Sequence, residues 1–164
     1  MTISQLAQEM IRISKGNLHD INHFLKVWAY ARTIGLGEGV PETVQTTLEA
    51  AALVHDIACP VCREKYGNTN GKCQEQEGGP MARELLTSLG AAPELIDRAA
   101  YLVEHHHTPA AVDGLDYQIL LEADYLVNAD ESRFSRENIE HARTVLFRTQ
   151  TGRELLDVIY LGKT

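Results

Sequence analysis

Four residues of the sequence have the side chains and the placement of metal ligands. His55 and Asp56 are adjacent and follow the apolar stretch AALV, at the end of an expected helix and just before a polar segment. His23 and Asp124 each lie in the middle of another stretch with helical periodicity. Two imidazoles and two carboxylates form a mixed nitrogen and oxygen set that suits Mn, Fe, Co, Ni, Mg or Zn without selecting among them. Three helices that each supply part of this set would form a metal centre inside a helical bundle.

Two of these residues also have simpler interpretations when each is taken alone. Asp124 is flanked by leucine and valine, where an unpaired carboxylate is costly to bury. An aspartate on the helix surface, or one paired with an arginine, avoids that cost. A single histidine within a helix, such as His23, is commonly a half-buried side chain that packs against its neighbours and binds no metal. The pair His55 and Asp56 is more informative, because helix ends that face loops are where sites are built.

The elements that would position these residues are helices. Thr2 and Gln5 match a capping box, and apolar residues follow them at helical spacing. No stretch alternates with period two for long enough to predict a strand. The expected helices cover about 3–15, 18–35, 42–57, 80–89, 93–106 and 116–129, with two more capped by Ser135 and Thr151.

Length and periodicity together predict an all-α, single-domain bundle of about seven to eight helices over residues 1–164. The residues with candidate chemistry fall in a core at about 17–130, and helices at 131–164 complete the chain. Between Pro60 and Gly79 the sequence is polar and is expected to be irregular. Loops of this length inside a domain are uncommon and are often functional.

Composition narrows the classes of partner and compartment. The formal charge of −8 argues against a nucleic-acid polymer as partner, because such binding needs clustered Lys and Arg. The N-terminus lacks the apolar region of a signal peptide, and no apolar run reaches the ~20 residues of a membrane span. We therefore expect a cytoplasmic protein that does not bind a membrane. Three cysteines, an odd count, argue against a disulfide framework in that compartment.

The order His, His-Asp, Asp on successive helices resembles the signature of the HD-domain superfamily of metal-dependent phosphohydrolases. The matching segments are HDINHFLKVWAYA, AALVHDIA, MARELLTSLGAAPELIDRAAYLVEHHH and LEADYLVN, which together span roughly residues 17–130. The resemblance implies an HD-like helical fold and assigns the metal ligands His23, His55, Asp56 and Asp124. It also implies hydrolysis of a phosphate ester.

The sequence departs from dinuclear members of that superfamily. Gln74 stands where such members have a histidine, so one bound ion is favoured over two. His105 and His106 stand where those members have another ligand of the second ion, and they are the candidates for a second metal site. The Gly-Tyr-Pro signature of the cyclic-dinucleotide subgroup is absent. The acidic pair of alarmone hydrolases is absent too, since Ile57 to Pro60 read IACP.

The implied reaction is attack of a metal-activated water on a nucleotide or another small phosphomonoester. Asp56 would orient this water while it binds the metal, and Glu77 is the first candidate for proton transfer. Basic residues near the site in sequence would bind the charged phosphate. These candidates are Lys26, Arg63, Lys65 and Lys72.

Three alternatives stay open at this point. Cys59 and Cys62, with Cys73, have the spacing of a structural zinc knuckle, although a fourth ligand is not evident. The scaffold would also serve as a metal or nucleotide sensor that binds without turnover. The apolar residues of the C-terminal helices belong either to the core or to the face of a homodimer.

Overall fold

The computed structural model describes residues 1–163, none of which lies in a β-strand, and the prediction of an all-α fold is confirmed. Its helices are α1 (Ile3–Ile13), α2 (Leu18–Gly37), α3 (Glu42–Val54), α4 (Cys59–Tyr66), α5 (Gly71–Ser88), α6 (Pro93–His105), α7 (Leu115–Glu131), α8 (Arg136–Val145) and α9 (Gln150–Leu156). A short 3-10 turn, η1 (Pro109–Ala111), precedes α7, and a π-helical turn, η2 (Asp157–Leu161), follows α9.

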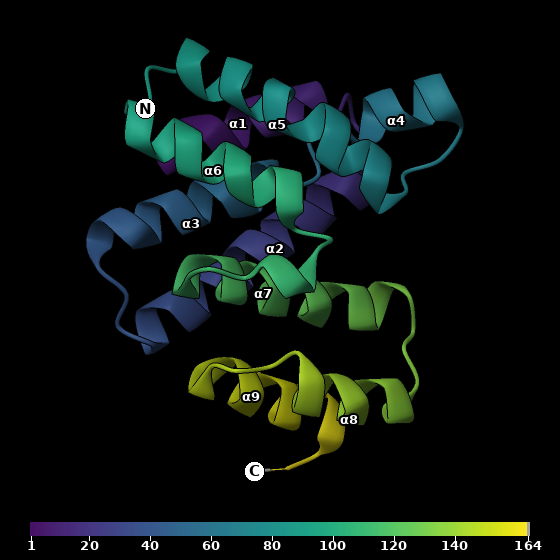
Figure 1. Ribbon diagram of the computed structural model, residues 1–164. Coiled ribbons are helices and arrows are strands. Elements are labelled where there is room, and N and C mark those ends of the chain that lie inside the picture. Colours follow the sequence, from purple (N-terminus) through teal and green to yellow (C-terminus); the bar gives the residue numbers. More distant parts are fainter. Residues whose placement is uncertain (164) are drawn as a thin grey trace.

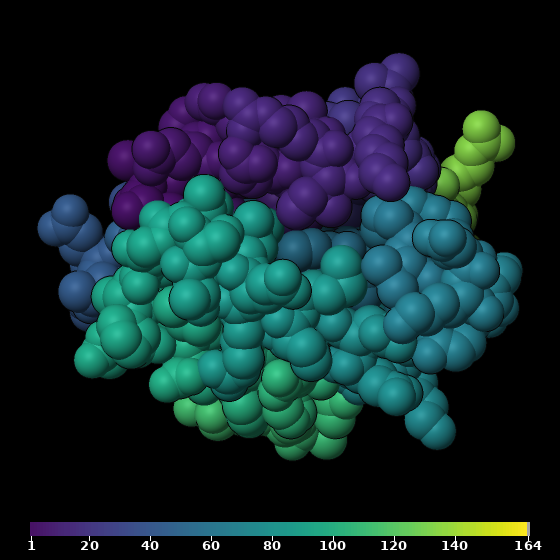
Figure 2. Space-filling model, turned by 90° about the horizontal axis from the view of Figure 1, so that it is seen from above, coloured from purple at the N-terminus to yellow at the C-terminus, as the bar shows by residue number. Residues whose placement is uncertain are grey.

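Helices α2, α3 and α7 form the centre of the bundle (Figure 1), and each of them packs against the other two. The α5–α6 pair covers α3 from one side, whereas α8 and α9 lie beyond α7 at the other end of the molecule. Figure 2 shows the covering face, with α1 and the start of α2 along one side and α4, α5 and α6 along the other. Each central helix carries, within it or directly after it, at least one of the four candidate metal ligands.

The core explains why these three helices hold fixed positions. Five consecutive residues of α3, from Ala50 to Val54, are fully buried, so this helix has neighbours on every side. Phe24 and Val27 of α2 belong to the same buried cluster, as does Leu120 of α7. Full burial of such side chains contributes roughly 1.5–3 kcal/mol each. Apolar packing therefore sets the geometry around the candidate site.

The expected irregular segment at 60–79 is the main error of the sequence-based fold. Residues 59–66 form α4, and α5 starts at Gly71, nine residues before the expected start at Pro80. The Asn70 side chain caps α5 by accepting a hydrogen bond from the Cys73 backbone N–H at 3.0 Å. Gly67 ends α4 in the left-handed conformation, with φ of 69°. Pro80 lies inside α5 and does not begin a helix.

Two other differences at helix boundaries are notable. Helix α3 ends at Val54, three residues earlier than predicted, and a turn at 55–58 follows it. The last helix is capped by Thr149 and not by Thr151, because the Thr149 hydroxyl accepts a hydrogen bond from the Gly152 backbone N–H. The first of these differences matters for the site, because it places His55 and Asp56 in the turn.

The cysteines are also paired, contrary to the expectation. Cys62 of α4 and Cys73 of α5 form a disulfide, with Cα atoms 6.2 Å apart, while Cys59 is free and buried. The pairing arises because α4 folds back onto α5, which an irregular segment would not do. The interpretation of Cys59, Cys62 and Cys73 as a zinc knuckle is therefore wrong, since two of the three sulfurs are bonded to each other.

Among residues 1–163, no helix combines the length and the apolar character needed to cross a membrane.

Candidate metal centre

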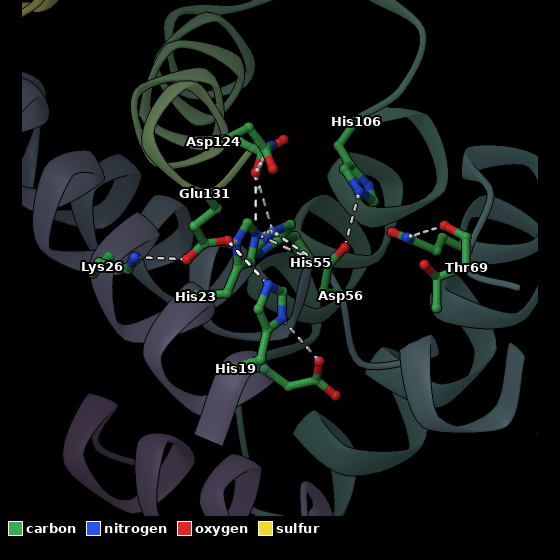
Figure 3. A network of polar contacts seen from close by, with 12 residues as sticks. His19, His23, Lys26, His55, Asp56, Thr69, His106, Asp124 and Glu131 are labelled. Atoms are coloured by element: carbon green, nitrogen blue, oxygen red, sulfur yellow. Dashed lines mark hydrogen bonds and ion pairs between the residues drawn. The ribbon is translucent and has the colours of Figure 1, made fainter. Parts of the chain in front are cut away.

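The fold brings His23, His55, Asp56 and Asp124 together, as Figure 3 shows. His23 projects from the middle of α2, His55 and Asp56 from the turn after α3, and Asp124 from α7. The Nε2 atoms of His23 and His55 are 3.2 Å apart. His23 Nε2 also lies 3.2 Å from Asp124 Oδ1 and 3.4 Å from Asp56 Oδ2. His55 Nε2 lies 3.6 Å from the same two carboxylate oxygens.

The hydrogen bonds on the far side of each ring decide what these nitrogens offer. His55 Nδ1 donates to the Ala52 carbonyl oxygen at 2.8 Å, and His23 Nδ1 donates to Glu131 Oε2 at 2.8 Å. A neutral imidazole that donates through Nδ1 presents a lone pair at Nε2. Both Nε2 atoms and two carboxylates therefore converge on one point, and with both rings neutral the group consists of acceptors only. Such a group requires a cation, so these residues fit a divalent metal ion.

The electrostatics of the cluster lead to the same requirement. Burial by itself lowers the pKa of His23, but the hydrogen bond to Asp124 and the charge of Asp56 outweigh it and raise the pKa to about 9. Burial raises the pKa of both Asp56 and Asp124, yet the neighbouring histidines hold each carboxyl well below its usual range. A positive charge is thus favoured here, carried either by a proton or by a bound metal ion.

A second group of ligand atoms adjoins the first through Asp56. His106 Nε2 lies 3.5 Å from Asp56 Oδ1, and the ligand atoms of Asp56, His106 and His107 all lie within 4.8 Å of one another. His106 Nδ1 donates to the Val103 carbonyl oxygen at 2.8 Å, which leaves Nε2 as a buried acceptor without a hydrogen-bond partner. Asp56 therefore faces one group with each of its two oxygens.

The structure alters the predicted members of the second group. His105 points elsewhere, because its Nδ1 donates to the Tyr101 carbonyl oxygen at 2.7 Å and its ring stacks on Tyr101. His107, which was not a predicted ligand, takes its place beside His106. His107 Nε2 hydrogen-bonds to Gln74 Oε1 at 2.9 Å, so Gln74 does lie at the second group. Burial and the neighbouring His106 lower the pKa of His107 to about 4, which keeps it neutral near pH 7.

A cavity of about 300 Å³ opens onto the first group. Among the predicted substrate-binding residues, Arg63 lines this cavity, and its guanidinium forms a bidentate ion pair with Asp20. Lys26 is not part of the lining, because its Nζ pairs with Glu131 Oε1 at 2.6 Å. Lys72 is exposed on α5, outside the lining.

The predicted proton-transfer residue does not reach this cavity either. Glu77 is on the surface of α5, where it pairs with Lys65 at 3.2 Å and accepts a hydrogen bond from the Tyr66 hydroxyl at 3.0 Å. These two contacts lower the pKa of Glu77, which holds its carboxyl in the ionised form. The structure does not bring Glu77 or the predicted phosphate contact Lys65 to this cavity, because α4 and the start of α5 are helical and turn both side chains toward each other.

Sequence reasoning missed two residues of α7 that support the site. Asn128 Nδ2 donates to Asp124 Oδ1 at 2.9 Å, and Glu131 accepts from His23. They lie four and seven residues after Asp124, so they share its face of the helix. That spacing was the available signal. Cys59 also lines the cavity, where burial and the charge of Asp56 raise the pKa of its thiol.

Comparison with known proteins gives two matches. The sequence profile of the HD domain matches residues 20–132. Among solved structures, the chain resembles a predicted HD superfamily hydrolase from an uncultured Thermotogales bacterium, with a TM-score of 0.70 and 24% sequence identity. The alignment covers 98% of this chain and 84% of the other, and at this identity it supports the fold. A search of curated proteins found no match.

Proposed function

The chain belongs to the HD-domain family, whose members bind divalent metals, and on this premise we propose that it is a metal-dependent phosphohydrolase. The observation that carries the proposal is the convergence of His23 and His55 Nε2 with the carboxylates of Asp56 and Asp124, a set that offers only lone pairs once a metal displaces the proton of His23. A divalent ion held by these residues would activate water as a nucleophile at neutral pH and polarise a phosphoryl oxygen.

The side chains of the site have distinct tasks in this proposal. His23 and His55 hold the metal through Nε2, because Nδ1 of each ring is already occupied as a donor. Asp56 and Asp124 stay ionised, since their pKa values are lowered, so they act as ligands and as acceptors that orient the attacking water. One ion at this first group is sufficient for the reaction. His106 Nε2 marks the position where a second ion would bind.

The substrate we propose is a small phosphomonoester, up to the size of a mononucleotide. The cavity volume of about 300 Å³ is at the lower end of the range for small-molecule sites. Among residues 1–163, its lining contains the cationic Arg63 but no Phe, Tyr or Trp on which a base would stack. Recognition is therefore directed to the phosphate, and Arg63 would exchange part of its pairing with Asp20 for the phosphate oxygens.

The test combines metal analysis with phosphate release. Wild-type protein and His55→Ala are analysed for bound metal, then assayed on nucleoside monophosphates and sugar phosphates with Mn, Co, Ni or Mg added. His141→Ala is the matched control, because His141 is exposed on α8. We expect metal and phosphate release in the wild type and the control, and neither in His55→Ala. Metal bound without phosphate release from any substrate would support a sensor instead of an enzyme.

A further inference from the structure

We propose that Glu131, held in place by Lys26, is the positioning residue of the metal centre and fixes His23 with a proton on Nδ1 and a free lone pair on Nε2. This inference rests on the proposed function, since it concerns the metal centre of the same site. It assigns roles to two residues that act on the metal centre through His23.

Three histidines of the site, His23, His55 and His106, present Nε2 in the same way, but they are held differently. His55 and His106 each follow the end of a helix, and each donates from Nδ1 to the backbone carbonyl three residues earlier. His23 lies in the middle of α2, where the helix itself uses the backbone carbonyls. Its Nδ1 therefore needs an acceptor from another element, and Glu131 of α7 is that acceptor.

The geometry of Glu131 suits this task. Its two oxygens have separate partners, since Oε2 accepts from His23 Nδ1 at 2.8 Å and Oε1 pairs with Lys26 Nζ at 2.6 Å. Lys26 is three residues after His23 on α2, so both side chains reach the same carboxylate. Figure 3 shows this chain of contacts from Lys26 through Glu131 to His23. A carboxylate accepts and cannot donate, so the proton of the imidazole must lie on Nδ1.

Burial makes the contact specific. The Glu131 side chain is 13% exposed and that of His23 is 8% exposed, so water has little access to replace the hydrogen bond. Without Glu131 the ring is free to carry its proton on Nε2, which cannot then bind a metal. Carboxylate partners of metal-bound histidines typically change metal affinity about 10- to 100-fold when they are removed.

The experiment is a Mn²⁺ titration of the metal-free protein, followed by the EPR signal of free Mn²⁺. We expect Glu131→Ala to weaken Mn²⁺ binding by about 10- to 100-fold. Glu131→Gln should lose less, because its amide oxygen still accepts from Nδ1, and Lys26→Met should also lose less than Glu131→Ala. Asp130→Ala is the matched control, an exposed carboxylate next to Glu131 on α7, and should bind Mn²⁺ as the wild type does.

A second readout follows the proton itself. In Zn²⁺-loaded protein, the Nδ1 proton of His23 should give a slowly exchanging NMR signal in the wild type and in Asp130→Ala, and it should be lost in Glu131→Ala. Equal Mn²⁺ affinity in wild type and Glu131→Ala, or a retained Nδ1 signal in that variant, would overturn the inference and leave the proposed function intact. No Mn²⁺ binding by the wild type would overturn both.

Discussion

At the scale of single residues, Asp56 is the side chain on which the site is organised. Its Oδ2 faces His23 and His55, and its Oδ1 faces His106. Burial by itself raises the pKa of Asp56, but the surrounding histidines lower it by a larger amount. The net pKa is below the usual value, so both oxygens are available as acceptors at neutral pH. Loss of this side chain would affect both groups of ligand atoms, whereas loss of Asp124 would affect only the first.

Asp124→Asn is predicted to bind metal at least about tenfold more weakly than the wild type. The amide has the same size, but it lacks the charge that compensates a divalent cation. The substitution should affect stability less than metal binding, because the amide occupies the same volume as the carboxylate and adds no buried charge. Mn²⁺ titration and thermal unfolding measure the two effects, with the exposed Asp130→Asn as control. Wild-type affinity in Asp124→Asn would remove this residue from the metal centre.

Metal binding should depend on pH through His23. Its pKa in the metal-free protein is about 9, above the ordinary value of 6.5, so near pH 7 the ring holds a proton that the metal must displace. We expect apparent Mn²⁺ affinity to rise about tenfold per pH unit for each displaced proton, and to level off near pH 9. Titrations from pH 6 to 9 measure this slope, and an affinity independent of pH would contradict it.

The same shift predicts how the stability of the metal-free protein varies with pH. Because the pKa of His23 is raised on folding, its proton stabilises the folded state fully below pH 6.5. That contribution is lost as pH rises through about 9. The Tm of the metal-free protein should therefore fall over this range, and saturating Mn²⁺ should reduce the fall. A Tm of the metal-free protein that rises over the same range would contradict the assignment.

The candidate ligands could be found from the sequence because each has a distinctive local context. His55 and Asp56 end an apolar helix, and Asp124 interrupts one. Their partners could not be chosen in the same way. Consecutive histidines where a helix ends point in different directions, so the sequence does not distinguish His105 from His107. Only the path of the chain after residue 105 decides between them.

At the scale of elements, α4 is the helix whose attachment depends on few contacts. Cys62 and Cys73 form, with Ala58, a small buried cluster that is separate from the main core. The ion pair of Arg63 with Asp20 adds a link from α4 to α2. Because α4 supplies Cys59 and Arg63 to the wall of the cavity, the disulfide helps to fix that wall.

Loss of the disulfide should therefore loosen α4 before the rest of the bundle. The double variant Cys62→Ser, Cys73→Ser is expected to lose about 2–4 kcal/mol of stability. Hydrogen exchange should show loss of protection in α4, while α2 and α7 stay protected. Thiol titration of the denatured wild type without reductant should find one free thiol, Cys59. Three thiols in protein purified under oxidising conditions would contradict the pairing.

The helices that the sequence missed have too few apolar residues to show a period. Residues 59–79 are mostly polar, so hydrophobic spacing gave no signal there. Helix-capping signals were nevertheless present in the sequence, since Gly67 ends α4 and Asn70 caps α5. Pro80 was interpreted as a helix start, whereas it is tolerated within α5. The fold of this segment depends on packing against α6 and on the disulfide, which no single stretch of sequence encodes.

At the scale of the whole molecule, the C-terminal helices are joined to the centre by a buried carboxylate. Glu122 of α7 is fully buried and accepts hydrogen bonds from the backbone N–H groups of Arg148 and Thr149, at 2.6 and 3.0 Å, and from the Thr149 hydroxyl. The same contacts fix the start of α9, because Thr149 is its N-cap. Glu122 thus connects the helix that carries Asp124 to the start of α9.

Glu122→Ala should destabilise the protein without weakening the metal centre. Removal of the carboxylate leaves the backbone N–H groups of Arg148 and Thr149 without their acceptor, at a cost of about 1–3 kcal/mol for the buried N–H of Thr149. Glu122 and Asp124 are two residues apart on α7, so they point about 200° apart around the helix and contact different neighbours. We expect a Tm lower by on the order of 5–10 °C, with unchanged Mn²⁺ affinity at a temperature where the variant is folded.

The control for this experiment is Glu140→Ala, which removes an exposed carboxylate of α8 whose ion pair with Arg136 contributes little. Its Tm should stay close to that of the wild type. Equal loss of stability in both variants would show that the effect comes from charge and not from the buried contacts of Glu122. A parallel loss of Mn²⁺ affinity in Glu122→Ala would show that the C-terminal helices help to shape the metal centre. The two ends of the bundle would then act as one cooperative unit, in which the site depends on the packing of α8 and α9 against α7.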